Sequence, residues 1–478
     1  MKLGRGADAV GVSAAKLAVS VAVLAAGFRA ISDDDYARVV IAQRFAEAPR
    51  LDPSGTSWLP VPFWVYGAAF RLFGSTLTTA RALAVLLGVG AALLLLAAAR
   101  LLGAGRVGAV TGALLAALFP WSAWLGAATV PEVPAAALVV FALATLARDG
   151  VRERLLGAFA LAVACFCRYE AWPIAVAFAG FSLADAARKR APSTAVASNQ
   201  FLFSAGLALS PIALWLLHGV LVHGDALFFW KRVASYRHAL GDGPPLGERL
   251  ASVPLSLIAD EPELWLGLVV VAADLRLLTS YRRPRVGALV LLAFLLLGEV
   301  SGGGPTHHAG RAVLPVWYLL ALMLGDLVGR RVEAAPRRYP GWLAFAASLT
   351  LLGWLYRVSA PPGFPDRSAA VALGTRAREL GAPALLIDTP DYSYLAVTAA
   401  FGAPNAAFPF DDRDPRRPRA PDAFASEAAL QARWAGRPDA WLVVTREHAP
   451  LAAAVGSMRE EAAGLTLVAP RAGAPGRR

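Results

Sequence analysis

Long apolar stretches separated by short polar segments run through most of the chain. A helix needs about 20 predominantly apolar residues to cross a bilayer. The pattern therefore predicts about eleven membrane-spanning helices. They are expected near residues 13–31, 79–101, 107–125, 131–146, 155–167, 171–187, 200–221, 251–273, 286–300, 312–329 and 341–357.

The composition supports a membrane protein rather than a soluble one. Of the 478 residues, 57% are hydrophobic and only 17% are charged, and the mean hydropathy is +0.52. A net charge of +12 could suggest binding to nucleic acid. The basic residues, however, occur in short clusters between apolar stretches, which is typical of topology signals. We therefore expect a polytopic α-helical membrane protein and no nucleic-acid partner.

The positions of these basic clusters predict the orientation of the chain. Lys2, Arg5 and Lys16 come before or within the first apolar stretch, so the N-terminus is expected on the cytoplasmic side. A cleaved signal peptide is the alternative for this stretch. Alternating the spans places the dense arginine clusters on one side. The outward segments are then 32–78, 121–131, 168–170, 222–250, 301–311 and the C-terminal tail.

The tail has a different composition and predicts a second domain. We expect a membrane domain over 1–357 and a small extracytoplasmic α/β domain over 358–478. Short buried strands are predicted at 384–387 and 441–444. Helices are expected from Asp366 or Ser368 to Gly381, near 391–401 and near 425–435, with a loop or linker at 403–422. The tail has no glycine-rich phosphate loop, so no nucleotide is assigned to it.

The first outward segment contains two predicted helices and an acidic motif. Apolar and polar residues recur over 33–48 as in a helix lying along the membrane face. An aromatic run with prolines over 58–73 predicts a second interfacial helix. The acidic motif Asp33, Asp34 and Asp35 opens the first of these helices. Ser32 or Asp33 can cap the helix while the other carboxylates favour its positive end, and a carboxylate held in this way can also act as a general base.

Other charged side chains gather in the outward segments. They are Glu132, Arg168, Glu170, His307, His308 and Arg311. Each has a local explanation: Glu132 can cap its own helix, Arg168 and Glu170 can pair, and the histidines can be solvated. Because the inward loops contain little besides arginine, the asymmetry indicates a reaction face. Arginine binds phosphate with two donors, and a nearby carboxylate can accept a proton. Together they favour group transfer from a lipid phosphate.

The order of motifs resembles a known superfamily. An acidic motif follows one span, then Trp58-x-Pro-x-Pro-Phe-Trp, a Phe73-Gly74 turn and a long helix that starts with Arg81. Further motifs are Arg168-Tyr-Glu-Ala-Trp and His307-His-x-x-Arg-x-x-x-Pro. Over about residues 15–330 this chain resembles the GT-C superfamily of integral-membrane glycosyltransferases. The branch is the one with protein O-mannosyltransferases and aminoarabinose transferases.

The resemblance implies an activity and roles for the candidate residues. It implies sugar transfer from a polyprenyl-phosphate-linked donor to a glycan, lipid or protein acceptor at the outer face of a bacterial plasma membrane. The catalytic base falls on Asp33–Asp35. Asp34 and Asp35 are favoured, because Asp33 is best placed as the cap. The candidate substrate-binding residues are Arg311, His307, His308, Arg168, Glu170, Glu132 and Trp58.

Two points of the resemblance stay open. Many relatives have His or Lys where this chain has Trp58, which leaves one contact with the donor undefined. Metal dependence varies across the superfamily, so a divalent metal ion is a possible cofactor, with Asp34 and Asp35 as its candidate ligands.

Two other functions fit part of the pattern. A lipid or solute transporter or flippase would explain the spans, but such proteins often contain two related halves. This chain shows no internal repeat, and its predicted number of spans is odd. A non-catalytic membrane protein whose outer domain recruits a partner is the third possibility.

Overall fold

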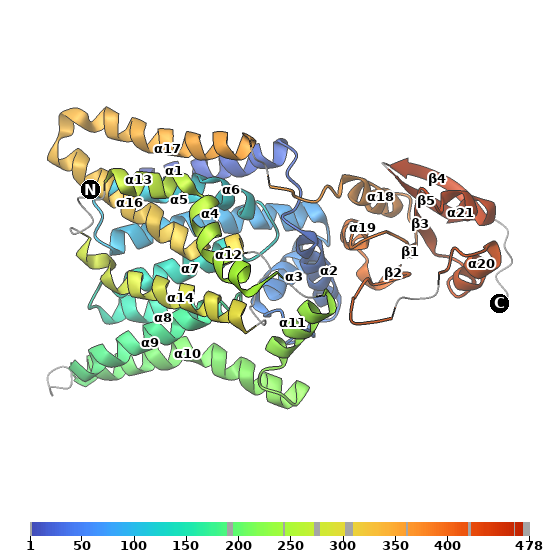
Figure 1. The fold of residues 1–478 in the computed structure, drawn as a ribbon, viewed down its shortest axis with the longest axis horizontal. Coiled ribbons are helices and arrows are strands. Elements are labelled where there is room, and N and C mark those ends of the chain that lie inside the picture. The colour runs from blue at the N-terminus through green and yellow to red at the C-terminus, as the bar shows by residue number, and fades with distance from the viewer. Residues whose placement is uncertain are drawn as a thin grey trace.

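A helical bundle and a small α/β domain make up the computed structural model, with the small domain at one end of the bundle (Figure 1). Described are residues 2–188, 195–241, 244–271, 278–301, 309–359, 362–418, 422–462 and 464–471. We call residues 362–471 the tail domain. Helices α2 (Asp33–Glu47), α3 (Val61–Phe73) and α11 (Phe228–Ala239) lie between the bundle and the tail domain.

The bundle contains the helices at most of the predicted spans. They are α1 (Lys2–Ala25), α4 (Leu77–Leu101), α5 (Arg106–Leu118), α6 (Pro120–Leu125), α7 (Glu132–Thr145), α8 (Val151–Cys165), α9 (Ala171–Arg188), α10 (Ala195–His223), α12 (Leu246–Ala259), α13 (Pro262–Val270), α14 (Arg282–Val300), α15 (Ala309–Ala312), α16 (Leu314–Ala334) and α17 (Tyr339–Ser359).

Two predicted spans are each divided into two helices. The stretch 107–125 breaks between α5 and α6, where Pro120 begins the second helix. The stretch 251–273 breaks between α12 and α13, where Pro262 begins the second helix. Proline lacks the backbone N–H that a continuing helix needs, and its ring displaces the preceding turn. The break at Asp260–Glu261 brings polar side chains into the bundle.

Three described helices are long and apolar enough to cross a membrane. They are Gly6–Ala25, Leu77–Leu101 and Ser198–His223. Arg106–Leu118 and Glu132–Thr145 are apolar but shorter. These helices indicate an integral membrane protein. The count of eleven spans stays a prediction.

Helix α16 is the centre of the bundle. Every residue from Leu314 to Gly329 is buried. Its glycines allow α5 to approach closely: a Cβ atom on Gly325 would lie 2.2 Å from the Cα of Gly112. Small residues at a helix interface are typical of membrane bundles, where close packing rather than water drives association.

The tail domain has helices α18 (Ser368–Glu379), α19 (Tyr394–Phe401), α20 (Glu427–Ala435) and α21 (Ala449–Val455) around one sheet. Its strands are β1 (Leu385–Ile387), β2 (Ala407–Pro409), β3 (Trp441–Thr445), β4 (Gly456–Ala462) and β5 (Leu465–Pro470). The order is β2-β1-β3-β5-β4. Strands β2, β1 and β3 are parallel, whereas β5 is antiparallel to both β3 and β4.

Most elements predicted for the tail are confirmed. The predicted strands are β1 and β3, and the predicted helices are α18, α19 and α20. The interpretation of 403–422 as a loop or linker is wrong in part, because β2 lies within it as an edge strand of the sheet. β2 ends in Pro409 and lacks the apolar run that marks β1, and proline within a sheet is confined to edges such as this one.

Candidate active site

The acidic motif occupies the first turn of α2, and its three carboxylates have different surroundings. Ser32 is the N-cap residue, and Asp35 reaches back toward it. The backbone N–H groups of Ile31 and Ser32 donate to Asp35 Oδ2 at 3.1 and 3.4 Å. The N–H of Thr129 donates to Asp35 Oδ1 at 3.0 Å. The prediction that Asp33 is the cap is therefore wrong: Ser32 is the N-cap, and Asp35 completes the capping box with it.

Asp35 is fully buried, and both of its carboxylate oxygens accept hydrogen bonds. Burial raises the pKa of this carboxyl, while the charges of Arg81 and Arg311 oppose the rise. A side chain held in this way joins α2 to the segment around Thr129. It has no free oxygen to offer a substrate.

Asp33 faces the tail domain. Arg367 donates from Nε and Nη2 to the two carboxylate oxygens of Asp33, both at 2.8 Å. The same guanidinium donates from Nη1 to Asp391 Oδ2 at 2.7 Å. This bidentate pairing fixes Asp33 and connects the start of α2 with the loop that follows β1.

Asp34 is the most accessible carboxylate of the motif. Its side chain is 44% exposed, compared with 23% for Asp33. Arg311 Nη1 lies 3.4 Å from Asp34 Oδ2. Of the three predicted candidates for a base, Asp34 alone is both open and next to a buried cation.

A buried carboxylate, Glu132 at the start of α7, holds the other predicted residues together. Arg311 Nε donates to Glu132 Oε1 at 2.9 Å, and Arg168 Nη1 lies 3.1 Å from the same oxygen. Glu132 is 2% exposed and Arg311 is 4% exposed. Residues 179 positions apart in the sequence thus form one ion pair in the interior.

Arg168 also has the local partner that the sequence suggested. It donates from Nη2 and Nε to the two oxygens of Glu170, at 2.5 and 3.1 Å. The local pairing and the site are therefore compatible. Next to it, the Tyr169 hydroxyl donates to the backbone oxygen of Ser57 at 2.7 Å, which connects this segment with the first outward loop.

The sequence interpretation missed Arg38. This residue lies one helical turn after Asp34 on α2 and is buried. Its guanidinium lies 4.5 Å from the ring centre of Trp58, which places the aromatic residue of the proline motif against a cation. The spacing of four residues from Asp34 was the available signal. We call Arg38, Arg168 and Arg311, with Glu132 between them, the arginine cluster.

The arginine cluster contains buried polar atoms without a hydrogen bond. Among the described residues, Arg38 Nε and Glu132 Oε2 have no hydrogen-bond partner, and Arg311 Nη2 lies 2.9 Å from Glu132 Oε1 without forming a well-aligned hydrogen bond. Buried polar groups are satisfied in most native structures, so unsatisfied donors at a cluster of charges suggest a ligand. Donors on arginine suit an anion with several oxygens.

His307 and His308 lie outside the described residues. Their predicted contact with a donor phosphate therefore stays a prediction. The described part of the same segment begins with α15, which carries Arg311.

The tail domain packs directly on α2. Gln43 donates to the backbone oxygen of Ala399 in α19 at 2.9 Å. Buried side chains of α2, α3, α18 and α19 form one hydrophobic cluster that includes Tyr36, Phe63 and Val397. The tail domain thus supports the helix that carries the acidic motif.

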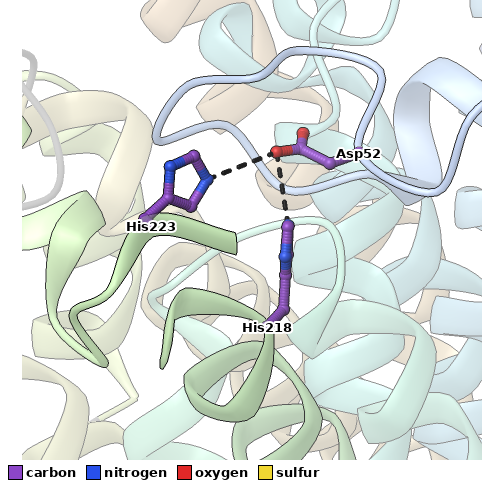
Figure 2. A group of neighbouring side chains, drawn as sticks. All are labelled: Asp52, His218 and His223. Atoms are coloured by element: carbon purple, nitrogen blue, oxygen red, sulfur yellow. Dashed lines mark hydrogen bonds and ion pairs between the residues drawn. The ribbon is translucent and has the colours of Figure 1, made fainter. Parts of the chain in front are cut away.

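A second group of polar residues could hold a metal ion. Asp52 lies in the first outward loop, and His218 and His223 lie at the end of α10; Figure 2 shows the two imidazoles turned toward one carboxylate oxygen. Asp52 Oδ2 lies 3.4 Å from His218 Nε2 and 3.9 Å from His223 Nε2.

The loop around Asp52 leaves that oxygen free for an ion. The Ser54 hydroxyl and the Gly55 N–H donate to Asp52 Oδ1 at 3.1 and 3.0 Å, and Oδ2 faces the histidines. Two imidazoles and one carboxylate suit Zn²⁺. Asp34 and Asp35, the metal ligands suggested from the sequence, are not in this group.

These features define a class of protein. A membrane-embedded helical bundle carries, beneath a small α/β domain, a buried cluster of arginines next to an accessible carboxylate. Such a site suits an anionic amphiphile whose head group lies at the membrane surface.

Comparison with known proteins identifies the relatives of this fold. The family profile described as dolichyl-phosphate-mannose-protein mannosyltransferase matches residues 53–217. ArnT from Cupriavidus metallidurans bound to undecaprenyl phosphate is 15% identical, with a TM-score of 0.57 over 100% of both chains. The structure of the same protein in the apo state matches with 14% identity and a TM-score of 0.57, over 98% of both chains.

A further structural relative is the archaeal oligosaccharyltransferase AglB from Archaeoglobus fulgidus, solved with an inhibitory peptide and a dolichol-phosphate. It is 12% identical, with a TM-score of 0.51 over 92% of this chain and 69% of that chain. No curated protein matches the chain. The resemblance to GT-C glycosyltransferases is confirmed, and the fold is similar to that of ArnT over its full length.

Proposed function

We propose that this protein is a membrane glycosyltransferase. It moves a sugar from a polyprenyl-phosphate-linked donor to an acceptor, with Asp34 as the general base and the arginine cluster as the phosphate site. One observation carries the proposal: Glu132 pairs with the buried Arg311 and the partly buried Arg168, the charge of the buried Arg38 also acts on it, and the accessible carboxylate of Asp34 lies next to Arg311.

The charges of the cluster favour a phosphate as the ligand. Glu132 is shared by Arg168 and Arg311, and no acidic side chain among the described residues forms an ion pair with Arg38. Arg38 Nε has no hydrogen-bond partner and can donate to a phosphate oxygen, and Arg311 adds its positive charge to the site. Such charge-assisted hydrogen bonds are strong in a site from which water is excluded.

The positions of the acidic residues favour Asp34 as the base. Asp33 is fixed by Arg367, and Asp35 is buried with both oxygens occupied. Asp34 can take the proton from an acceptor hydroxyl or amine as that atom attacks the anomeric carbon. The bond from the anomeric carbon to the phosphate oxygen breaks at the same time. The lipid phosphate leaves with its negative charge balanced by Arg311 and its neighbours.

A direct attack of this kind inverts the configuration at the anomeric carbon, since acceptor and leaving group lie on opposite faces. The protein therefore needs a phosphate site on one side of the sugar and a base on the other. Arg311 lies next to Asp34, so the donor phosphate would contact the far side of the cluster, toward Arg168 and Arg38.

The proposed location is a bacterial plasma membrane, with the N-terminus in the cytoplasm and the tail domain outside. The supporting observation is that α2, which carries Asp34 and Arg38, lies beside the tail domain, whereas the junction of α16 and α17, where predicted cytoplasmic arginines lie, is at the opposite end of the bundle (Figure 1). The printed partners of the structural relatives, undecaprenyl phosphate for ArnT and dolichol-phosphate for AglB, support a polyprenyl-phosphate donor.

The test is a transfer assay in membranes with a panel of labelled polyprenyl-phosphate sugars and an extract of envelope lipids, glycans and proteins as acceptors. Wild-type protein should move label from at least one donor, and D34N should not, while D33N keeps most of the activity. No transfer from any donor, with label instead crossing the membrane unchanged, would support the flippase alternative.

A further inference from the structure

Two acidic residues that the proposed chemistry does not use lie inside the bundle. Glu261 and Glu263 stand at the break between α12 and α13. They are 0% and 2% exposed, respectively. Ionisable residues within membrane helices are costly and are usually associated with function.

The two carboxyl groups have few partners. The backbone N–H of Trp121 donates to Glu261 Oε1 at 2.7 Å. Glu261 Oε2 and both oxygens of Glu263 have no hydrogen-bond partner among the described residues. Glu261 and Glu263 flank Pro262 at the start of α13, and each carboxyl acts electrostatically on the other.

Gly353 of α17 makes room for this pair. A Cβ atom on Gly353 would lie 2.6 Å from Glu263 Oε1, so the carboxyl packs directly on the helix backbone. The pair is therefore enclosed by α13, α17 and the start of α6. A carboxylate in such a place cannot be solvated by bulk water.

The surrounding charges do not neutralise the pair. The positive charge of Arg357 on α17 acts on Glu261, but this side chain donates to the backbone oxygen of Asp260 and lies 3.2 Å from Asp260 Oδ1. Among the described residues no arginine or lysine forms an ion pair with Glu261 or Glu263. An unpaired buried charge costs several kcal/mol, and two facing carboxylates add their mutual repulsion.

We propose that Glu261 and Glu263 form a proton-binding site in the membrane domain, with one proton shared between the two carboxyl groups. The proton makes one carboxyl a donor to the other and removes one of the two buried charges. Sharing of a proton between adjacent carboxyls is an established arrangement. A hard metal ion fits this site less well than a proton, because Ca²⁺ or Mg²⁺ requires about six oxygen ligands.

The site stands next to the proposed phosphate site. Asp260, the neighbour of Glu261, lies so close to Gly310 that a Cβ atom there would be 2.6 Å from Asp260 Oδ2. Gly310 precedes Arg311. Loss of the shared proton would leave two facing carboxylates at this junction, with Asp260 and Arg357 as the charged groups around them. The repulsion would loosen the junction between α12 and α13, and with it the contact of Asp260 with Gly310 next to Arg311.

A hydrophobic carbodiimide tests the proposal on the full-length protein in membranes. The reagent adds only to a protonated carboxyl: the acid proton moves to a carbodiimide nitrogen, and the carboxyl oxygen bonds to the central carbon. The O-acylisourea then rearranges to a stable N-acylurea, so the adduct contains all atoms of both reactants. Peptide mass spectrometry locates the adduct on Glu261 or Glu263.

Glu132 is the matched control. It is equally buried, but two arginines pair with it, so it stays ionised and should not react. We expect labelling of the Glu261–Glu263 peptide to exceed that of the Glu132 peptide by at least about tenfold, and to fall between about pH 6 and pH 10. Absence of an adduct on both glutamates across this range would overturn the proposal.

A second measurement does not depend on access of the reagent. In E263Q the amide replaces the shared proton as a donor to Glu261. The midpoint of thermal unfolding of wild type should fall as the pH rises above neutral, and that of E263Q should fall less. Equal pH dependence in both proteins, or a metal ion that wild type retains and E263Q loses, would contradict a shared proton. Neither measurement uses transferase activity.

Discussion

The guanidinium of Arg311 and the carboxylate of Glu132 form a buried ion pair, with Nε donating to Oε1 at 2.9 Å. The pair joins α15 to the start of α7 and places Arg311 next to Asp34. Both side chains are nearly inaccessible to solvent. This contact thus helps to fix the position of the proposed phosphate site.

Removing Glu132 should destabilise the protein. E132A removes the buried carboxylate that Arg168 and Arg311 share and leaves them only Glu170 and Asp34 as partners. Breaking a buried pair costs about 3–5 kcal/mol. Thermal unfolding in detergent should show a clear loss. E379A is the control, because Glu379 forms only an exposed pair with Arg376. An unchanged midpoint in E132A would show that the cluster is not a structural unit.

Replacing Asp34 should affect catalysis and not stability. D34N removes the proposed proton acceptor and should lower kcat by about 10²–10⁴-fold, because this is the usual effect of losing a general base. The side chain is 44% exposed, so the unfolding midpoint should stay near that of wild type. If D34N keeps wild-type kcat, another residue is the base.

Changing the arginines should weaken binding of the lipid phosphate. R38K keeps the charge but loses the planar fork, so the KM for the donor should rise, with a smaller change in kcat. Binding of undecaprenyl phosphate can be measured from its stabilisation of the purified protein against heat. R433K is the control, since Arg433 lies in α20 of the tail domain. Equal binding by R38K and wild type would remove Arg38 from the phosphate site.

Breaking the contact between Arg367 and α2 should release the tail domain. R367A removes the hydrogen bonds to Asp33 and Asp391, so hydrogen exchange in α2 and α18 should increase. R376A, which changes an exposed arginine of α18, should have little effect. Exchange that is the same in R367A and wild type would show that the hydrophobic cluster alone holds the domain.

The same contact has a defined pH dependence. Burial alone would raise the pKa of Asp391, but hydrogen bonds from Ser393 and Arg367 hold it below the ordinary value of 3.8. A lowered pKa adds stability that is fully present above pH 3.8 and is lost as the pH falls through the lower, folded-state value. The contribution is modest, because Asp391 is 44% exposed.

The group of Asp52, His218 and His223 should bind zinc. Purified protein incubated with Zn²⁺ should retain about one equivalent after desalting. H218A and D52A should lose it, whereas H238A should not, because His238 lies outside the group. Retention of zinc by both H218A and D52A would place the metal elsewhere.

The helices and strands near the site could be predicted because each depends on local sequence. Apolar periodicity gave α2 and α3, and short apolar runs gave β1 and β3. The breaks before Pro120 and Pro262 were overlooked because long apolar runs dominate the pattern. Proline at a helix start was the signal for both.

The candidate site could be predicted only as a set of residues on one side of the membrane. The sequence placed Asp34, Glu132, Arg168 and Arg311 in outward segments, because charged residues are excluded from the apolar spans. It could not separate Asp33, Asp34 and Asp35, which are identical in type and consecutive. Their different partners, Arg367, Arg311 and Thr129, come from distant parts of the chain.

The sequence by itself thus determined a membrane protein with an acidic motif, outward arginines and an α/β tail, since hydropathy and local periodicity act over a few turns. The tertiary structure decided which carboxylate is buried, which is open, and that Arg38 belongs with Arg311. The reason is physical. The surroundings of a side chain are set by helices that pack against it from far along the chain, and a single sequence does not encode that packing locally.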